Sequence, residues 1–88
     1  MIVEYRKTFL KELSVIPAQI RKNIETFVFD ELPKLNTLSQ SGKIEKMKGY
    51  SSYFKVRFGN YRVGIKLENS KIILECVLHR KDIYKFFP

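Results

Sequence analysis

The side chains of this sequence that could do chemistry are mostly cations. Lys55 and Arg57 alternate with apolar residues in Tyr53–Phe58, and Arg62 does the same in Tyr61–Leu67. An arginine holds phosphate oxygens with a planar, always ionised fork. A lysine crowded by other cations gives up its proton more readily, which makes Lys55 a candidate base. With one His and one Cys in the chain, this set predicts phosphoryl chemistry on RNA, whose 2′-OH is the nucleophile, and neither a metal site nor a cofactor.

A short turn sets the positions of these cations. Gly59-Asn60 between two alternating runs predicts a two-residue hairpin. Arg57 then lies opposite Arg62, and Lys55 lies opposite Gly64. Like charges at opposed positions cost a sheet a few tenths to ~1 kcal/mol, so the fold alone gives no reason to gather them. We expect Gly64 to open a hollow beside an anion site; the alternative is a solvated outer face.

The first half of the chain predicts a strand and two helices. Met1–Tyr5 alternates and favours a strand. Lys7–Val15 has helical spacing, and Pro17 suits the first turn of a second helix. Pro33 should end or kink that second helix near residues 31–32. The two helices form a hairpin.

The second half predicts strands. The loop Thr37–Lys43 leads into a short strand at Lys43–Lys48, and the hairpin strands follow. A second turn at Asn69-Ser70 precedes Ile72–Leu78, and Arg80–Phe87 predicts one or two helical turns. The fold class is therefore α+β: an N-terminal strand, a helical hairpin, an antiparallel sheet of about four strands packed on the helices, and a short C-terminal helix.

The turn at Asn69-Ser70 sets the faces of the sheet. A two-residue loop there places Ile65 opposite Leu74, Val63 opposite Cys76 and Tyr61 opposite Leu78. All of these would face the helices, with Cys76 a small buried hydrophobe. The opposite, basic face would carry Tyr53, Lys55, Arg57, Arg62, Lys66, Glu75 and His79.

The end of the chain adds candidates. His79 and Arg80 end the last strand at the rim of the basic face, and Tyr84 shares a helical side with Arg80. Ile83, Phe86 and Phe87 should take the packing side. Alternatively, His79 is a hydrogen-bonding residue at a strand end and Tyr84 a half-buried helix tip.

Composition limits the class of protein. The chain has 88 residues, 17 Lys plus Arg and 9 Asp plus Glu, for a net charge of +8. We expect one domain, residues 1–88, with no membrane span or signal peptide, in the cytoplasm. Residues 41–88 hold 11 basic and 4 acidic side chains. This half suits RNA, DNA, the ribosome or an acidic protein, although it is also compatible with a solvated surface.

Two segments resemble the RelE branch of the RelE/ParE toxin superfamily. They are Lys48-Gly49-Tyr50 with Tyr53–Val63, and Val77–Tyr84 with its His-Arg-Lys-Asp-Ile-Tyr run. The resemblance implies a RelE-like microbial RNase fold and a toxin of a type II toxin–antitoxin pair. Such toxins cut mRNA in the ribosomal A site without a metal or cofactor, leaving a 2′,3′-cyclic phosphate and a 5′-hydroxyl. It also implies a cognate antitoxin as partner, in a toxin–antitoxin hetero-oligomer.

The resemblance implies roles for single residues. Lys55 matches a base or charge stabiliser, Arg62 the arginine that holds the scissile phosphate, and Arg80 one that stabilises the transition state or protonates the leaving group. Tyr84 matches a tyrosine that stacks on or orients the substrate nucleotide, and the role of His79 stays open. The further residues expected to contact RNA or the ribosome are Arg57, Lys66, Lys48, Tyr53 and Lys81.

Two other functions fit the sequence. The ParE branch shares the fold but inhibits DNA gyrase and has no RNA-cleaving set of residues. An inert basic module that binds RNA or the ribosome is the third class. The presence of Lys55, Arg62, Arg80 and Tyr84 together favours the ribonuclease.

Overall fold

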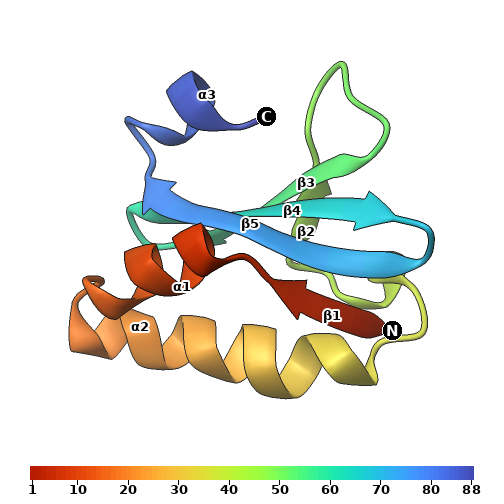
Figure 1. The fold of residues 1–88 in the computed structure, drawn as a ribbon, viewed down its shortest axis with the longest axis horizontal. Coiled ribbons are helices and arrows are strands. Elements are labelled where there is room, and N and C mark those ends of the chain that lie inside the picture. The colour runs from red at the N-terminus through yellow and green to blue at the C-terminus, as the bar shows by residue number, and fades with distance from the viewer.

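A five-stranded sheet is the centre of the molecule (Figure 1). The computed structural model describes residues 1–88. In space the strands follow the order β1-β5-β4-β3-β2. Only β1 runs parallel to its neighbour, and the other pairings are antiparallel, which confirms the α+β fold. The strands are β1 (Ile2–Tyr5), β2 (Ile44–Lys46), β3 (Tyr53–Phe58), β4 (Tyr61–Glu68) and β5 (Lys71–His79).

The helical hairpin covers one face of the sheet, and the C-terminal helix lies on the other (Figure 1). The hairpin consists of α1 (Lys7–Ser14) and α2 (Ala18–Glu25). A π-helical turn at Thr26–Glu31 and a 3-10 turn at Leu32–Lys34 continue α2. Regular helix thus ends before Pro33, as expected for a residue that cannot donate a main-chain hydrogen bond.

The main core fills the space between the hairpin and the sheet. Its fully buried side chains alternate along the strands and recur every three or four residues along the helices. Burying each of them contributes about 1.5–3 kcal/mol. They include Phe9, Ile24, Phe27, Leu32, Val56, Val63, Ile65, Ile72 and Leu74.

The register of the two hairpins was predicted correctly at one turn and only in part at the other. Arg57 pairs with Arg62 and Lys55 with Gly64, as expected. Ile65 pairs with Leu74, also as expected, but a bulge follows in which Glu75 has no partner. The bulge shifts the rest of the strand by one residue.

The shift reverses the faces at the end of β5. Val63 pairs with Val77, and Tyr61 pairs with His79. Cys76 and Leu78 therefore face away from the hairpin, and the predictions that Val63 opposes Cys76 and that Tyr61 opposes Leu78 were wrong. His79 lies on the helix side and not on the basic face, because residues that pair directly share a face.

The C-terminal helix has the shorter of the two lengths expected. α3 spans Ile83–Phe86, a single turn. Ile83 and Phe87 are buried, but Phe86 is 73% exposed, so its predicted packing role was wrong. No helix in the chain has the length and apolar character needed to cross a bilayer.

Candidate functional site

The tight hairpin between β3 and β4 gathers the cations of the basic face. Arg57 and Arg62 lie directly opposite each other. With Lys55, they line a hollow of about 70 Å³ that Glu45 and Tyr84 complete. We call this the basic hollow. Its walls come from β2, β3, β4 and α3, so it forms only when all four elements are in place.

Arg62 is the only buried charged residue, with 8% of its surface exposed. Its Nη1 donates to the carbonyl oxygens of Gly59, at 2.8 Å, and of Tyr61, at 3.0 Å. No carboxylate pairs with it. Nε and Nη2 of Arg62 have no hydrogen-bond partner in the protein. Because every buried side-chain nitrogen in the structure does have one, these two atoms are accessible, and they face the basic hollow. A buried cation without a counter-ion is costly, and an anionic ligand would remove that cost.

Lys55 and Tyr84 contact each other across the basic hollow. The Lys55 ammonium donates to the Tyr84 hydroxyl at 2.7 Å and lies 5.1 Å from the centre of the ring. Tyr84 is 61% exposed, so one face of its ring is open to solvent. The pair offers a proton-transfer group beside an aromatic surface on which a base can stack.

Glu45 was missed by the sequence analysis. It pairs with Lys55 across β2 and β3, lies on the same face, and forms no ion pair. Its position in the wall of the basic hollow makes it a candidate general base. Alternation in residues 43–48 placed it in a strand, but the long connection to Tyr53 hid its register.

A second apolar cluster holds the C-terminal tail against the basic face. It consists of Met47, Cys76, Ile83 and Phe87, and we call it the tail cluster. Burial raises the pKa of the Cys76 thiol to about 12. This thiol is therefore an inert packing group.

The missing side chain of Gly64 leaves a notch in the sheet, and the Phe87 ring of the tail fits into it. A Cβ at this position would lie 2.7 Å from Cys76 Sγ and 3.0 Å from two ring carbons of Phe87. The space at Gly64 is thus filled by the Phe87 ring, and the prediction that Gly64 opens a hollow beside an anion site was wrong. Gly64 and Phe87 act on the site indirectly, because they seat the helix that carries Tyr84.

The other predicted residues lie outside the basic hollow. The main-chain N–H of Arg80 donates to the Asn60 carbonyl at 2.7 Å, which places Arg80 beside the hairpin turn with an exposed, unpaired guanidinium. His79 accepts a hydrogen bond from the Lys81 main chain at 3.1 Å and packs edge-on against Tyr61. It has the geometry of a hydrogen-bonding residue at a strand end.

Of three residues expected to bind RNA, Lys66 and Tyr53 have neighbours within the protein and Lys48 forms no ion pair. The Lys66 ammonium pairs with Glu68 at 3.0 Å, which raises the pKa of Lys66, and it lies 5.7 Å from the Tyr53 ring centre. Tyr53 packs edge-on against Phe87. Lys48 forms no ion pair and lies in the loop after β2.

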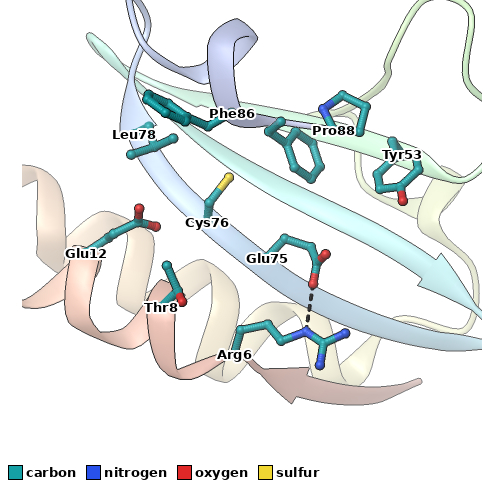
Figure 2. Close-up of a pocket in the computed structure, with 10 residues that line it drawn as sticks. Arg6, Thr8, Glu12, Tyr53, Glu75, Cys76, Leu78, Phe86 and Pro88 are labelled. Atoms are coloured by element: carbon teal, nitrogen blue, oxygen red, sulfur yellow. Dashed lines mark hydrogen bonds and ion pairs between the residues drawn. The ribbon is translucent and has the colours of Figure 1, made fainter.

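A larger cavity, of about 530 Å³, lies between α1, β5 and the tail (Figure 2). Its polar lining includes Glu12 and a 2.8 Å ion pair between Arg6 and Glu75. Partial burial raises the pKa of Glu12, whose carboxylate accepts the Val77 main-chain N–H. Glu75 was expected as a counter-ion near the basic face, but its partner is Arg6. Apolar walls and two carboxylates make this cavity a poor phosphate site.

No three His, Cys, Asp or Glu side chains come together in the chain as a set that could hold a metal ion.

Comparison with known proteins places this geometry in a family. Residues 3–84 match the family described as the ParE toxin of the type II toxin–antitoxin system parDE. Toxin RelE3 of Methanocaldococcus jannaschii is 44% identical over the full length of both chains. The toxin in the RelB–RelE antitoxin–toxin complex of Methanococcus jannaschii is 39% identical, with a TM-score of 0.78 over 97% of this chain and 99% of that one.

More distant structures share the fold. The isolated Escherichia coli RelE toxin is 11% identical, with a TM-score of 0.67 over 98% of both chains. The Mycobacterium tuberculosis RelBE2 complex matches at 20% identity and a TM-score of 0.67, over 92% of both chains.

Proposed function

Because this chain belongs to the RelE/ParE superfamily of type II toxin–antitoxin toxins, we propose that it is an endoribonuclease that cuts mRNA in the ribosomal A site. The observation that carries the proposal is the buried, unpaired Arg62 beside Lys55 and Arg57. Cations fixed in a partly dry site stabilise the charge that develops on a phosphorane. They do so without reorganising during the reaction.

The proposed reaction needs no group beyond the RNA and these side chains. The 2′-oxygen attacks the adjacent phosphorus, and its proton passes to the Glu45 carboxylate or to the amine form of Lys55. The bond to the 5′-oxygen breaks, and the departing 5′-oxygen takes a proton from the Arg80 guanidinium. The products are a 2′,3′-cyclic phosphate and a 5′-hydroxyl. Arg62 grips the non-bridging oxygens, and Arg57 adds positive charge from the opposite strand.

Two groups act from the rim of the basic hollow. We assign to the unpaired Arg80 guanidinium, beside the hairpin turn, contact with the phosphate or the leaving oxygen. Tyr84 orients the nucleotide by stacking, and Lys55 fixes its hydroxyl at 2.7 Å. We assign no step to His79, because its ring faces the helix side of the sheet.

The small size of the basic hollow argues for help from the ribosome. A volume of about 70 Å³ holds a phosphate group but does not align a whole nucleotide. Alignment of the 2′-OH with the bond to be broken is a large part of such a barrier. We therefore expect strong cleavage on translating ribosomes and little on naked RNA.

We also propose a cognate antitoxin as partner. Relatives solved in complex with antitoxins include the M. jannaschii, M. tuberculosis and E. coli toxins. Lys55, Arg57 and Arg62 form no ion pair within this chain, so an acidic segment would find unneutralised charge on the basic face.

The rival function is inhibition of DNA gyrase, which the match to the ParE family favours. Primer extension on mRNA from cells that express the protein separates the two functions. New 5′ ends inside translated codons indicate the ribonuclease, and accumulated gyrase–DNA breaks indicate the gyrase inhibitor.

A matched pair of variants tests the role of Arg62. We expect Arg62→Ala to slow single-turnover cleavage on programmed ribosomes by about 100- to 1000-fold. Arg21→Ala is the control, since the Arg21 guanidinium also donates to main-chain carbonyls, those of Ser14 and Ile16, but on the helix side. If folded Arg62→Ala cleaves at the wild-type rate, the ribonuclease proposal is refuted.

A further inference from the structure

The loop between β2 and β3 projects from the sheet on the side that carries α3 (Figure 1). Residues 46–51 line an open hollow of about 530 Å³ there. Tyr50 is 48% exposed at this surface. Lys46 and Lys48 flank it without forming an ion pair, and no acidic side chain lines the hollow.

This loop is an ordered turn. The Tyr50 main-chain N–H donates to the Met47 carbonyl at 3.1 Å, and Gly49 between them has a φ of +86°. A positive φ at the third position is the requirement of a type II turn, and glycine meets it without strain. Met47, at the first position, is buried in the tail cluster and anchors the turn.

Aromatic contacts fix the Tyr50 ring. It packs edge-on against Tyr53 at 5.8 Å between centroids. Tyr53 packs edge-on against Phe87 at 5.5 Å, and Phe87 fills the notch at Gly64. The ring is therefore held in place before any ligand arrives.

We propose that Tyr50, with Lys48, is a second RNA subsite, where the Tyr50 ring stacks on a base of the single-stranded RNA whose phosphate occupies the basic hollow. This inference rests on the proposed function and adds a binding position to it. Exposed aromatic rings among cations suit single strands, because every base has a π face and the lysines neutralise phosphates. Tyr50 contacts Tyr53, which lies on the same face of β3 as Lys55, so one strand of RNA can run along this face from the basic hollow to the Tyr50 ring.

The test measures binding without cleavage. The probes are a labelled 2′-O-methyl RNA of ~12 nucleotides, within the usual range of site sizes, and an abasic 2′-O-methyl strand with the same number of phosphates. Because neither contains a 2′-OH, binding is measured whether or not the protein is a nuclease. The binding result can therefore be interpreted even if the protein proves not to be a nuclease.

We expect Tyr50→Ala to weaken binding of the RNA by about 5- to 150-fold, the effect of one stacked base. It should leave binding of the abasic strand and the salt dependence unchanged. Tyr50→Trp should retain binding, since the larger ring still stacks. Lys48→Ala should weaken both probes alike and reduce the salt slope by about 0.7–1.

Phe86→Ala is the matched control, because Phe86 is exposed but lines the cavity on the other side of the tail (Figure 2). Three results would overturn the proposal: wild-type affinity in Tyr50→Ala, an equal loss on the abasic strand, or an equal loss in Tyr50→Trp. Wild-type RNA affinity together with weakened antitoxin binding would assign the loop to the protein partner instead.

Discussion

Alanine in place of Gly64 is the sharpest test of how the tail is seated. At an open strand position, replacing glycine by alanine stabilises a fold by roughly 0.5–1 kcal/mol. Here the new Cβ would lie 2.7 Å from Cys76 Sγ and 3.0 Å from the Phe87 ring. Both neighbours are buried, so neither can move away freely.

The balance of these effects predicts a loss. Overpacking a core costs about 1–3 kcal/mol, and expelling the Phe87 ring would cost a similar amount in lost burial. We expect Gly64→Ala to lower the free energy of unfolding by about 1–2 kcal/mol. For a domain of this size, the melting temperature then falls by roughly 4–16 °C.

The same change should disturb the site. If Phe87 leaves its notch, α3 shifts and the contact between Lys55 and Tyr84 is lost. Nuclear Overhauser effects between the Lys55 methylenes and the Tyr84 ring should be present in the wild type and absent in Gly64→Ala. Cleavage should fall along with them.

Two controls sharpen the experiment. Gly42→Ala adds a Cβ with nothing within 4 Å and should leave the melting temperature unchanged or slightly higher. Adding Cys76→Ala to Gly64→Ala removes the nearest clash and should recover part of the loss. If Gly64→Ala melts at or above the wild-type temperature with the Lys55–Tyr84 contact intact, the seating argument fails.

Three further predictions concern single side chains. Arg57→Ala should raise stability by a few tenths to ~1 kcal/mol, measured by urea unfolding, because it relieves repulsion from the opposed Arg62. Burial raises the pKa of Glu12 above its ordinary value of 4.5. Ionisation of Glu12 therefore lowers the free energy of unfolding as the pH rises from 4.5 through the raised pKa. Glu12→Gln, which keeps an acceptor for the Val77 N–H, should melt above the wild type at pH 7, with the difference shrinking as pH falls toward 4.5. Cys76, with a pKa raised to about 12, should resist a thiol reagent at pH 8 in native protein and react on unfolding; fast native labelling would contradict its seat in the tail cluster.

The sequence was most informative where a turn and two alternating strands agreed. Gly59-Asn60 fixed the register of β3 and β4, and with it the opposition of Arg57 and Arg62. The predicted register of β4 and β5 failed at Glu75, because a bulge adds a residue to one strand without changing the residue types around it. From that point the predicted faces of Cys76, Leu78 and His79 were reversed.

The tertiary contacts of the site were harder to foresee. Tyr84 was expected near the basic face, but its contact with Lys55 depends on the fit between Gly64 and Phe87. Glu45 enters through the pairing of a three-residue strand, which no turn motif specifies. Such features follow from packing between distant segments and leave little trace in local patterns.

The pairing of β1 with β5 has a consequence for synthesis. Ion pairs between these ends of the chain span 67 residues, from Glu4 to Lys71, and 69 residues, from Arg6 to Glu75. At a synthesis rate of about 5–20 residues per second, β5 is made roughly 3–14 s after β1. The β3–β4 hairpin can form meanwhile, but Tyr84 and Phe87 are made after it and after β5. A nascent chain therefore completes its basic hollow later than its sheet, and that delay gives an antitoxin time to bind before the toxin is competent.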